Sequence, residues 1–182
     1  MKKHHGTRVA GRLALGTLAL GGLALTACGS DATGAAKPVT VTMSDYKYGN
    51  LPKEVKAGTT FEVVNESKAE LHEFVAIALP AGEKRTVAEL VKLPEAELAP
   101  LLSAQPATVM LAPPGGAPVI TAVGDGSIAT PGRYVILCAI PTGAKPQEYL
   151  DAVAKAQGQK PEGVAGGPPH FVSGMAAELI VK

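Results

Sequence analysis

Four side chains whose donor atoms suit a soft metal ion stand out in the sequence. They are His72, Cys138, His170 and Met175. Two imidazoles, one thiolate and one weak thioether are a ligand set that a single copper ion accepts, with the thioether as the distant axial ligand. Taken singly, each of these residues is more typical of core packing, because buried His, Cys and Met are common in globular domains. The prediction of one mononuclear copper therefore depends on the set of four.

The first 27 residues have the features of a signal peptide. They contain four Lys and Arg residues, no acidic residue, and an apolar run at 13–26 (LALGTLALGGLALT). As a helix this run would span about 21 Å, which is short for a bilayer core of about 30 Å. The sequence Leu25-Thr26-Ala27-Cys28 resembles the lipobox of bacterial lipoproteins, in which the Cys becomes the lipid-modified first residue. An ordinary cleavage site beside an incidental Cys is the alternative.

We therefore expect three segments in the chain. Residues 1–27 are predicted to be a lipoprotein signal peptide, residues 28–37 a flexible tether, and residues 38–182 a single copper-binding domain. The lipid on Cys28 would hold the protein at the extracytoplasmic face of the cell membrane. Once the signal peptide is removed, His72 and His170 are the remaining histidines, and Cys138 has no cysteine partner for a disulfide.

Several function classes find no support in the residues. The chain after residue 27 is mildly acidic without a basic cluster, so we expect no nucleic-acid partner. It has no Gly-x-Ser-x-Gly motif, and His72-Glu73 lacks the second His of a zinc-protease motif. We therefore expect that the protein is not an enzyme. Zinc suits the proposed ligands poorly because it seldom takes a thioether.

The local pattern predicts mostly short strands. We expect strands at 39–43, 60–64, 71–79, 133–138 and 177–181, and a further strand at 119–123. Residues 86–102 predict two short helices with a break at Leu93-Pro94, the first opened by a Thr86-x-x-Glu89 capping box. Residues 145–157 have helical spacing, and residues 106–118 look like a loop. Short strands with helices only as insertions favour an all-β sandwich or barrel.

Three stretches resemble the cupredoxins, the plastocyanin-like blue copper proteins. They are LPKEVKAGTTFEVVNESKAELHEF, PGRYVILCAIP and HFVSGMAAELIV. The resemblance implies a Greek-key β-sandwich with the metal at one end. It also implies that His72, Cys138 and His170 are the equatorial ligands and Met175 the axial ligand.

The sequence departs from the family in two places. The segment between Cys138 and His170 has 31 residues (139–169), where plastocyanin-like loops have a handful, so it would form a lid or a docking surface. Glu73 follows the first ligand where many cupredoxins have Asn. Strand alternation directs Glu73 away from the metal, although a backbone twist would let its carboxylate join a non-blue site.

Three further residues are predicted to support the ligands. Asn65 would brace the Cys138 loop through backbone hydrogen bonds, with a plain turn residue as the alternative, and Pro141 and Phe171 would keep water off the metal.

The resemblance implies a membrane-anchored, monomeric one-electron carrier that meets protein redox partners. The alternatives are a copper-handling lipoprotein for storage, delivery or sensing, and a metal-free binding module on the same fold.

Overall fold

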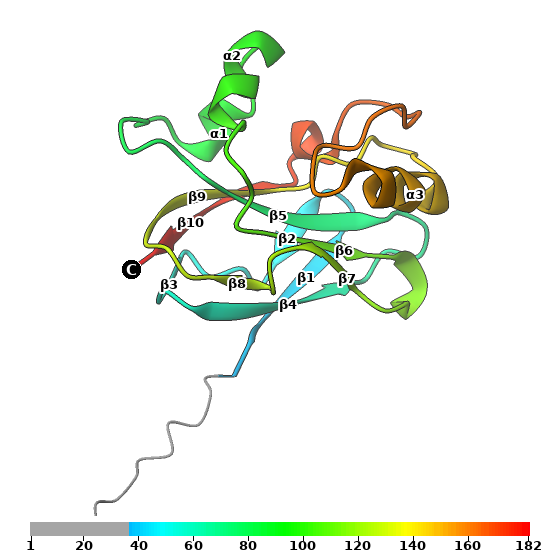
Figure 1. Ribbon diagram of the computed structural model, residues 1–182, viewed down its shortest axis with the longest axis horizontal. Coiled ribbons are helices and arrows are strands. Elements are labelled where there is room, and N and C mark those ends of the chain that lie inside the picture. The colour runs from blue at the N-terminus through cyan, green and yellow to red at the C-terminus, as the bar shows by residue number, and fades with distance from the viewer. Residues whose placement is uncertain (1–36) are drawn as a thin grey trace, which may run out of the picture. The chain divides into compact units, whose positions relative to one another are not determined.

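The computed structural model describes residues 37–182, which form two β-sheets (Figure 1). The four-stranded sheet has the order β2-β1-β4-β8, with bounds Lys47–Gly49, Val39–Ser44, Thr59–Asn65 and Ser127–Ile128. The six-stranded sheet has the order β3-β10-β9-β5-β6-β7, with bounds Glu54–Val55, Ala176–Val181, Gly132–Leu137, His72–Ala78, Thr108–Ala112 and Ile120–Val123. The expected all-β sandwich with short helical insertions is confirmed.

The six-stranded sheet contains a Greek-key arrangement. Strands β5, β6 and β7 follow one another as antiparallel neighbours, and β9 returns from the other sheet to pair antiparallel with β5. The spatial order β9-β5-β6-β7 is therefore the fourth strand beside the first, second and third, which defines the motif. Because β9 lies between β5 and β10, the residues that end β5 and β9 become neighbours.

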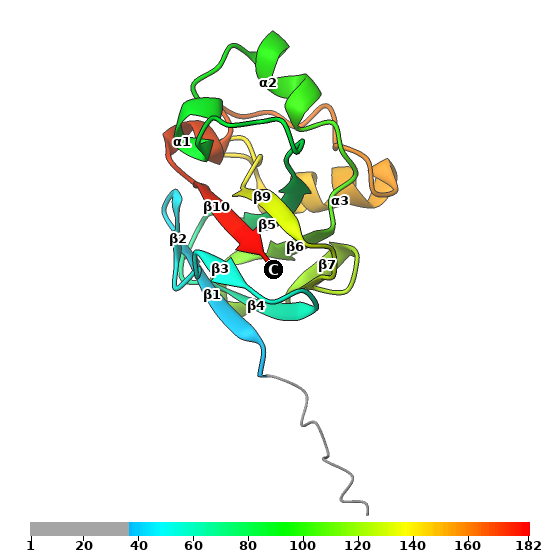
Figure 2. The same cartoon turned by 90° about the vertical axis from the view of Figure 1, so that its left-hand side faces the viewer.

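Three α-helices interrupt the strands: α1 (Val87–Leu90), α2 (Glu95–Leu101) and α3 (Pro146–Ala156). All three lie on the side of the six-stranded sheet away from the four-stranded sheet (Figures 1 and 2). The predicted capping box is present, since the Thr86 side chain accepts from the Glu89 N–H while the Glu89 carboxylate accepts from the Thr86 N–H. Two 3-10 helices, η1 (Pro114–Gly116) and η2 (His170–Ser173), complete the helical segments.

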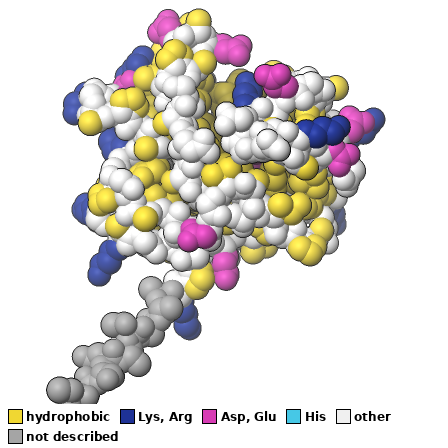
Figure 3. Space-filling view, in the orientation of Figure 1, with side chains coloured by type: hydrophobic (Ala, Val, Ile, Leu, Met, Phe, Trp, Pro, Cys, Tyr) yellow, Lys and Arg dark blue, Asp and Glu magenta, His cyan; other side chains and the backbone are white. Residues whose placement is uncertain are grey.

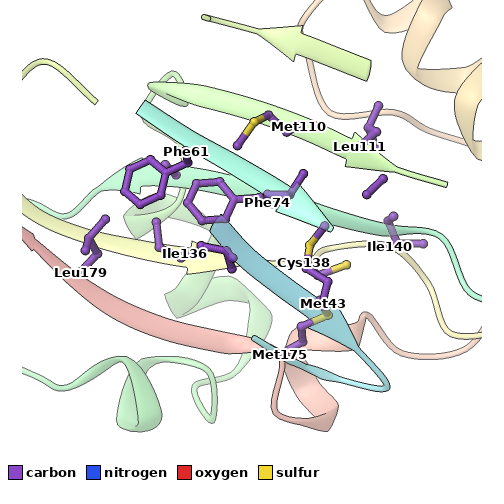
Figure 4. Packing of buried hydrophobic residues seen from close by; sticks show 14 of the residues in the cluster. Met43, Phe61, Phe74, Met110, Leu111, Ile136, Cys138, Ile140, Met175 and Leu179 are labelled. Carbon is purple, nitrogen blue, oxygen red and sulfur yellow. The ribbon is translucent and has the colours of Figure 1, made fainter. Parts of the chain in front are cut away.

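The six-stranded sheet is buried on both faces, so β5 and β9 alternate between two hydrophobic clusters. Towards the four-stranded sheet they direct Phe74, Ala76, Tyr134 and Ile136, part of which Figure 4 shows. Towards α1 and α2 they direct Val75, Ile77, Val135 and Leu137. This alternation places His72 and Cys138 on the inner face and their neighbours Glu73 and Ala139 on the outer face.

One expected loop is a strand. Residues 106–118 look loop-like because prolines and glycines dominate the segment, but Thr108–Ala112 forms β6. It is held in the sheet by pairing with β5 on one side and β7 on the other. The local sequence cannot predict this pairing with distant strands. Strands β2 and β3 were not predicted either, since runs of three and two residues are too short to show alternation.

The signal peptide, the tether from Cys28 and the lipid attachment site lie outside the described residues, apart from Lys37. Within residues 37–182 no helix has the length and apolar character needed to cross a bilayer.

Candidate metal centre

The ends of two neighbouring strands and one 3-10 helix bring three donor side chains together. His72 begins β5, Cys138 directly follows β9, and His170 begins η2. The His72 Nδ1 lies 3.2 Å from the His170 Nδ1, which lies 3.3 Å from the Cys138 Sγ. The three donor atoms are all within 4.8 Å of one another. Three residues separated by up to 98 positions thus direct N, N and S atoms at one point.

Met175 lies at the same end of the sandwich. It is fully buried, and Figure 4 draws it near Cys138, together with Met43 from β1. Backbone hydrogen bonds fix its place, because the Met175 N–H donates to the His170 carbonyl and its own carbonyl accepts from the Cys138 N–H. The fourth predicted ligand is therefore tied to two of the other three through the main chain.

Burial keeps both imidazoles neutral. His72 and His170 have no exposed surface, and no histidine is visible on the face drawn in Figure 3. Desolvation, with a smaller effect of His170, lowers the pKa of His72 to about 4, and desolvation also lowers the pKa of His170. Both rings are therefore uncharged at neutral pH and can present a lone pair to a metal ion.

The Cys138 thiol lies in a dry environment with one hydrogen-bond donor from the neighbouring strand. The Glu73 N–H donates to the Cys138 Sγ at 3.4 Å. Burial, and then the charge of Glu73, raise the pKa of the Cys138 thiol well above its usual range. A metal ion that binds this sulfur therefore displaces a proton and supplies the charge that stabilises the thiolate.

The second nitrogen of each imidazole ring, Nε2, also lies in the protein interior. His72 Nε2 and His170 Nε2 are buried, and neither forms a hydrogen bond within residues 37–182. His170 Nε2 lies 3.5 Å from the Glu70 Oε2. When Nδ1 binds a metal ion, Nε2 carries the ring proton, so the Glu70 carboxylate is placed to orient His170. The sequence offered no signal for Glu70, which lies in the loop two residues before His72.

A short backbone stem closes the long segment 139–169. Pro141 and Pro169 face each other in an antiparallel bridge. On either side of them the His170 N–H donates to the Ile140 carbonyl at 3.0 Å and the Thr142 N–H donates to the Pro168 carbonyl at 3.0 Å. Proline is tolerated at this pair because the bridge needs no N–H from the facing residues themselves. The distance between Cys138 and His170 is thus set by the stem and not by the length of the excursion.

Glu73 directs its carboxylate away from the donor atoms, as strand alternation predicts. Its Oε1 accepts from the Ala139 N–H at 2.8 Å and its Oε2 accepts from the Tyr149 hydroxyl at 3.1 Å. The arrangement in which Glu73 joins the metal is not observed. Burial raises the pKa of Glu73 to about 7, opposed by its two hydrogen bonds.

The other supporting residues lie partly elsewhere than expected. Asn65 braces the segment before His72 and not the Cys138 loop, because its Nδ2 donates to the carbonyls of Glu70 and Ala112. Phe171 packs against the outer-face cluster beside α1 and α2, although its N–H donates to the Cys138 carbonyl. Tyr46, which was not predicted, meets the His170 ring edge-on at 4.9 Å between ring centres.

Comparison with known proteins gives a limited result. No protein-family model matches the chain, and no curated protein matches it. Three auracyanin structures are similar to it. The reduced auracyanin from the photosynthetic bacterium Roseiflexus castenholzii is 20% identical, with 82% of this chain and 99% of that chain covered and a TM-score of 0.39. Auracyanin A, a blue copper protein of the green thermophilic photosynthetic bacterium Chloroflexus aurantiacus, is 16% identical, with coverages of 80% and 100% and a TM-score of 0.37, and auracyanin B is 13% identical, with coverages of 81% and 89% and a TM-score of 0.33.

Proposed function

We propose that the chain binds one copper ion through His72, Cys138 and His170, with Met175 as a weak axial ligand, and that it serves as a one-electron carrier. The observation that carries the proposal is the convergence of two neutral imidazole nitrogens and one sulfur within 4.8 Å, fully buried. Thiolate, thioether and imidazole together are the ligand types that copper accepts.

Bound copper would supply a one-electron change between Cu(II) and Cu(I). The protein's part is to hold the donor atoms in place and to keep water away. All four predicted ligands are fully buried, so the site offers no open position to a substrate molecule. A closed site whose donors are fixed by strand pairing and by the Pro141–Pro169 stem favours electron transfer over substrate chemistry.

A visible titration tests the copper site. Cu(II) is added to the full chain, purified in mild detergent, and the intense thiolate-to-copper band is recorded. We expect one equivalent of copper to develop the band, Cys138→Ala to abolish it, and Cys28→Ala to leave it unchanged. The last variant is the matched control because it makes the same substitution at the other cysteine of the chain. A chain that binds copper without the band, or not at all, would contradict the proposal.

A copper-handling role, in storage, delivery or sensing, is the alternative use of the same ligands. Voltammetry of the copper-loaded chain separates the two. A reversible one-electron wave with no loss of copper on reduction supports the carrier, whereas release of Cu(I) during the cycle supports copper handling.

We also propose that lipid on Cys28 holds the domain at the extracytoplasmic face of the membrane, where it meets protein redox partners as a monomer. The support is the apolar run followed by Leu25-Thr26-Ala27-Cys28. Cell fractionation tests it: the intact chain should sediment with membranes, and Cys28→Ser should not. Mass spectrometry of the N-terminal peptide should show a lipid on Cys28, and an unmodified peptide beginning before residue 28 would overturn this part.

A further inference from the structure

Helix α3 carries one buried hydroxyl that contacts Glu73, the residue after His72. Tyr149 lies on α3, inside the segment 139–169, and has 3% of its surface exposed. Its O–H donates to the Glu73 Oε2 at 3.1 Å, across 76 positions of sequence. A buried hydroxyl that binds a buried carboxylate is a specific contact, because without it the Tyr149 hydroxyl and the Glu73 Oε2 would each lose a hydrogen bond in a dry environment.

Glu73 links the Tyr149 hydroxyl to the backbone after Cys138 and to the Cys138 sulfur. The Oε1 of Glu73 accepts from the Ala139 N–H at 2.8 Å, directly after Cys138 in the chain. The Glu73 N–H donates to the Cys138 Sγ at 3.4 Å. On the inner side the Tyr48 hydroxyl donates to the Glu73 carbonyl at 2.7 Å. Glu73 therefore ties the start of β5 to the Cys138 sulfur through its N–H and to Ala139 through its carboxylate.

We propose that Tyr149 is a positioning residue for the metal centre, acting through Glu73 to fix Ala139 and the N–H that reaches the Cys138 sulfur. The proposal rests on the proposed copper site and deepens it. It gives α3 a structural part in the site, beside the lid or docking surface expected from the length of the segment. Hydrogen bonds to a ligating sulfur reduce its electron donation, so this brace affects the potential as well as the geometry.

The test compares two tyrosines that each lose a single hydroxyl. Tyr149→Phe removes the donor to Glu73. Tyr134→Phe is the matched control, since Tyr134 is also buried and its hydroxyl donates to the Thr130 carbonyl at 2.8 Å, away from the donor atoms. Both variants are examined as full chains by amide hydrogen exchange without metal, and by visible spectrum and voltammetry with copper.

We expect Tyr149→Phe to speed exchange of the Ala139 amide about five- to tenfold, as the loss of one hydrogen bond predicts. With copper, the thiolate band should shift and the reduction potential should fall, because a less constrained Glu73 N–H leaves the sulfur more electron-rich. Tyr134→Phe should lower the free energy of unfolding. It should leave the thiolate band, the reduction potential and the exchange rate of the Ala139 amide relative to the other amides unchanged. Glu73→Ala should move the exchange of Ala139, the band and the potential in the same directions and by at least as much, because it removes the acceptor of the Ala139 N–H itself. Adding Tyr149→Phe to Glu73→Ala should then change little.

Equal Ala139 exchange in the two tyrosine variants would overturn the inference, and so would an unchanged potential in Tyr149→Phe. Failure of the copper site itself gives a different result: the unsubstituted chain would show no thiolate band, whatever the exchange of Ala139.

Discussion

Asn65 shows how one side chain holds the segments on both sides of a ligand. Its Nδ2 donates to the Glu70 carbonyl at 2.8 Å and to the Ala112 carbonyl at 2.7 Å, and its Oδ1 accepts from the Ser67 N–H at 2.8 Å. Ala112 is the partner of His72 in the β5–β6 register. The amide therefore fixes both the turn that leads to His72 and the strand beside it.

Replacing this amide by a carboxylate should weaken both contacts. Asn65→Asp keeps an acceptor for the Ser67 N–H but removes the donor to two carbonyls, so we expect the free energy of unfolding to fall by about 1–3 kcal/mol. Urea unfolding of the metal-free chain measures it. Asn50→Asp makes the same change at an exposed position and should stay within about 0.5 kcal/mol. Equal effects of the two variants would contradict the prediction.

At the scale of elements, residue types predicted three donor side chains that the structure brings together, whereas the contacts between distant elements had to come from the structure. His72, Cys138, His170 and Met175 stood out through their chemistry and scarcity. Strand β1 stood out through local alternation, and β4, β5, β9 and β10 through short runs of apolar, β-forming residues. The Tyr149–Glu73 contact has no local pattern, because it joins a helix to a strand 76 positions away. Likewise, β6 is a strand because of its two neighbours, in a segment whose prolines favour a loop.

The stem below the long segment depends on a glycine. A Cβ on Gly166 would lie 2.5 Å from the Pro141 Cβ and 3.0 Å from the Thr142 carbonyl oxygen, whereas a Cβ on Gly167 would lie at ordinary contact distance, 3.5 Å from the Thr142 Cβ. We expect Gly166→Ala to cost about 1–3 kcal/mol of stability and to weaken copper binding by opening the stem. Gly167→Ala is the matched control and should do neither. The copper titration and urea unfolding together measure both effects, and a Gly166→Ala chain that binds copper normally would exclude this role of the stem.

Charged groups hold the segment that leads into α1 against the sheet, and their contribution to stability depends on pH. Hydrogen bonds from Arg85 lower the pKa of Glu83 to about 2, and Arg133 donates to the Glu83 and Arg85 carbonyls and pairs with Glu178 on β10. The folded state holds Glu83 ionised where the unfolded chain would bind a proton. This contribution is therefore present above about pH 4.5 and is lost as the pH falls towards 2.

Glu83→Gln should remove that part of the pH dependence. The difference in melting temperature between the unsubstituted chain and the variant should be largest near neutral pH and should shrink between pH 4.5 and 2. Thermal unfolding followed by circular dichroism measures it. A difference that stays constant over this range would show that the ion pair does not contribute.

On the scale of the whole molecule, copper binding should stabilise the fold. The donor atoms come together only in the folded chain, so copper at a free concentration 1,000 times its dissociation constant should add about 4 kcal/mol to the free energy of unfolding. Calorimetry with and without copper should show a rise in melting temperature for the unsubstituted chain and a much smaller rise for Cys138→Ala. An equal rise in both would place the copper outside the predicted ligands.

The position of β10 has a consequence for the protein's biosynthesis. Strand β10 is made after the other described strands, yet it lies inside the six-stranded sheet between β3 and β9, and Met175 directly precedes it. Cys138, His170 and Met175 all follow β9 in the chain, so a nascent polypeptide offers His72 as the single one of these four side chains until residue 138 has been added. We therefore expect the proposed copper site to form only after β10 has entered the sheet, when all four donor side chains are present.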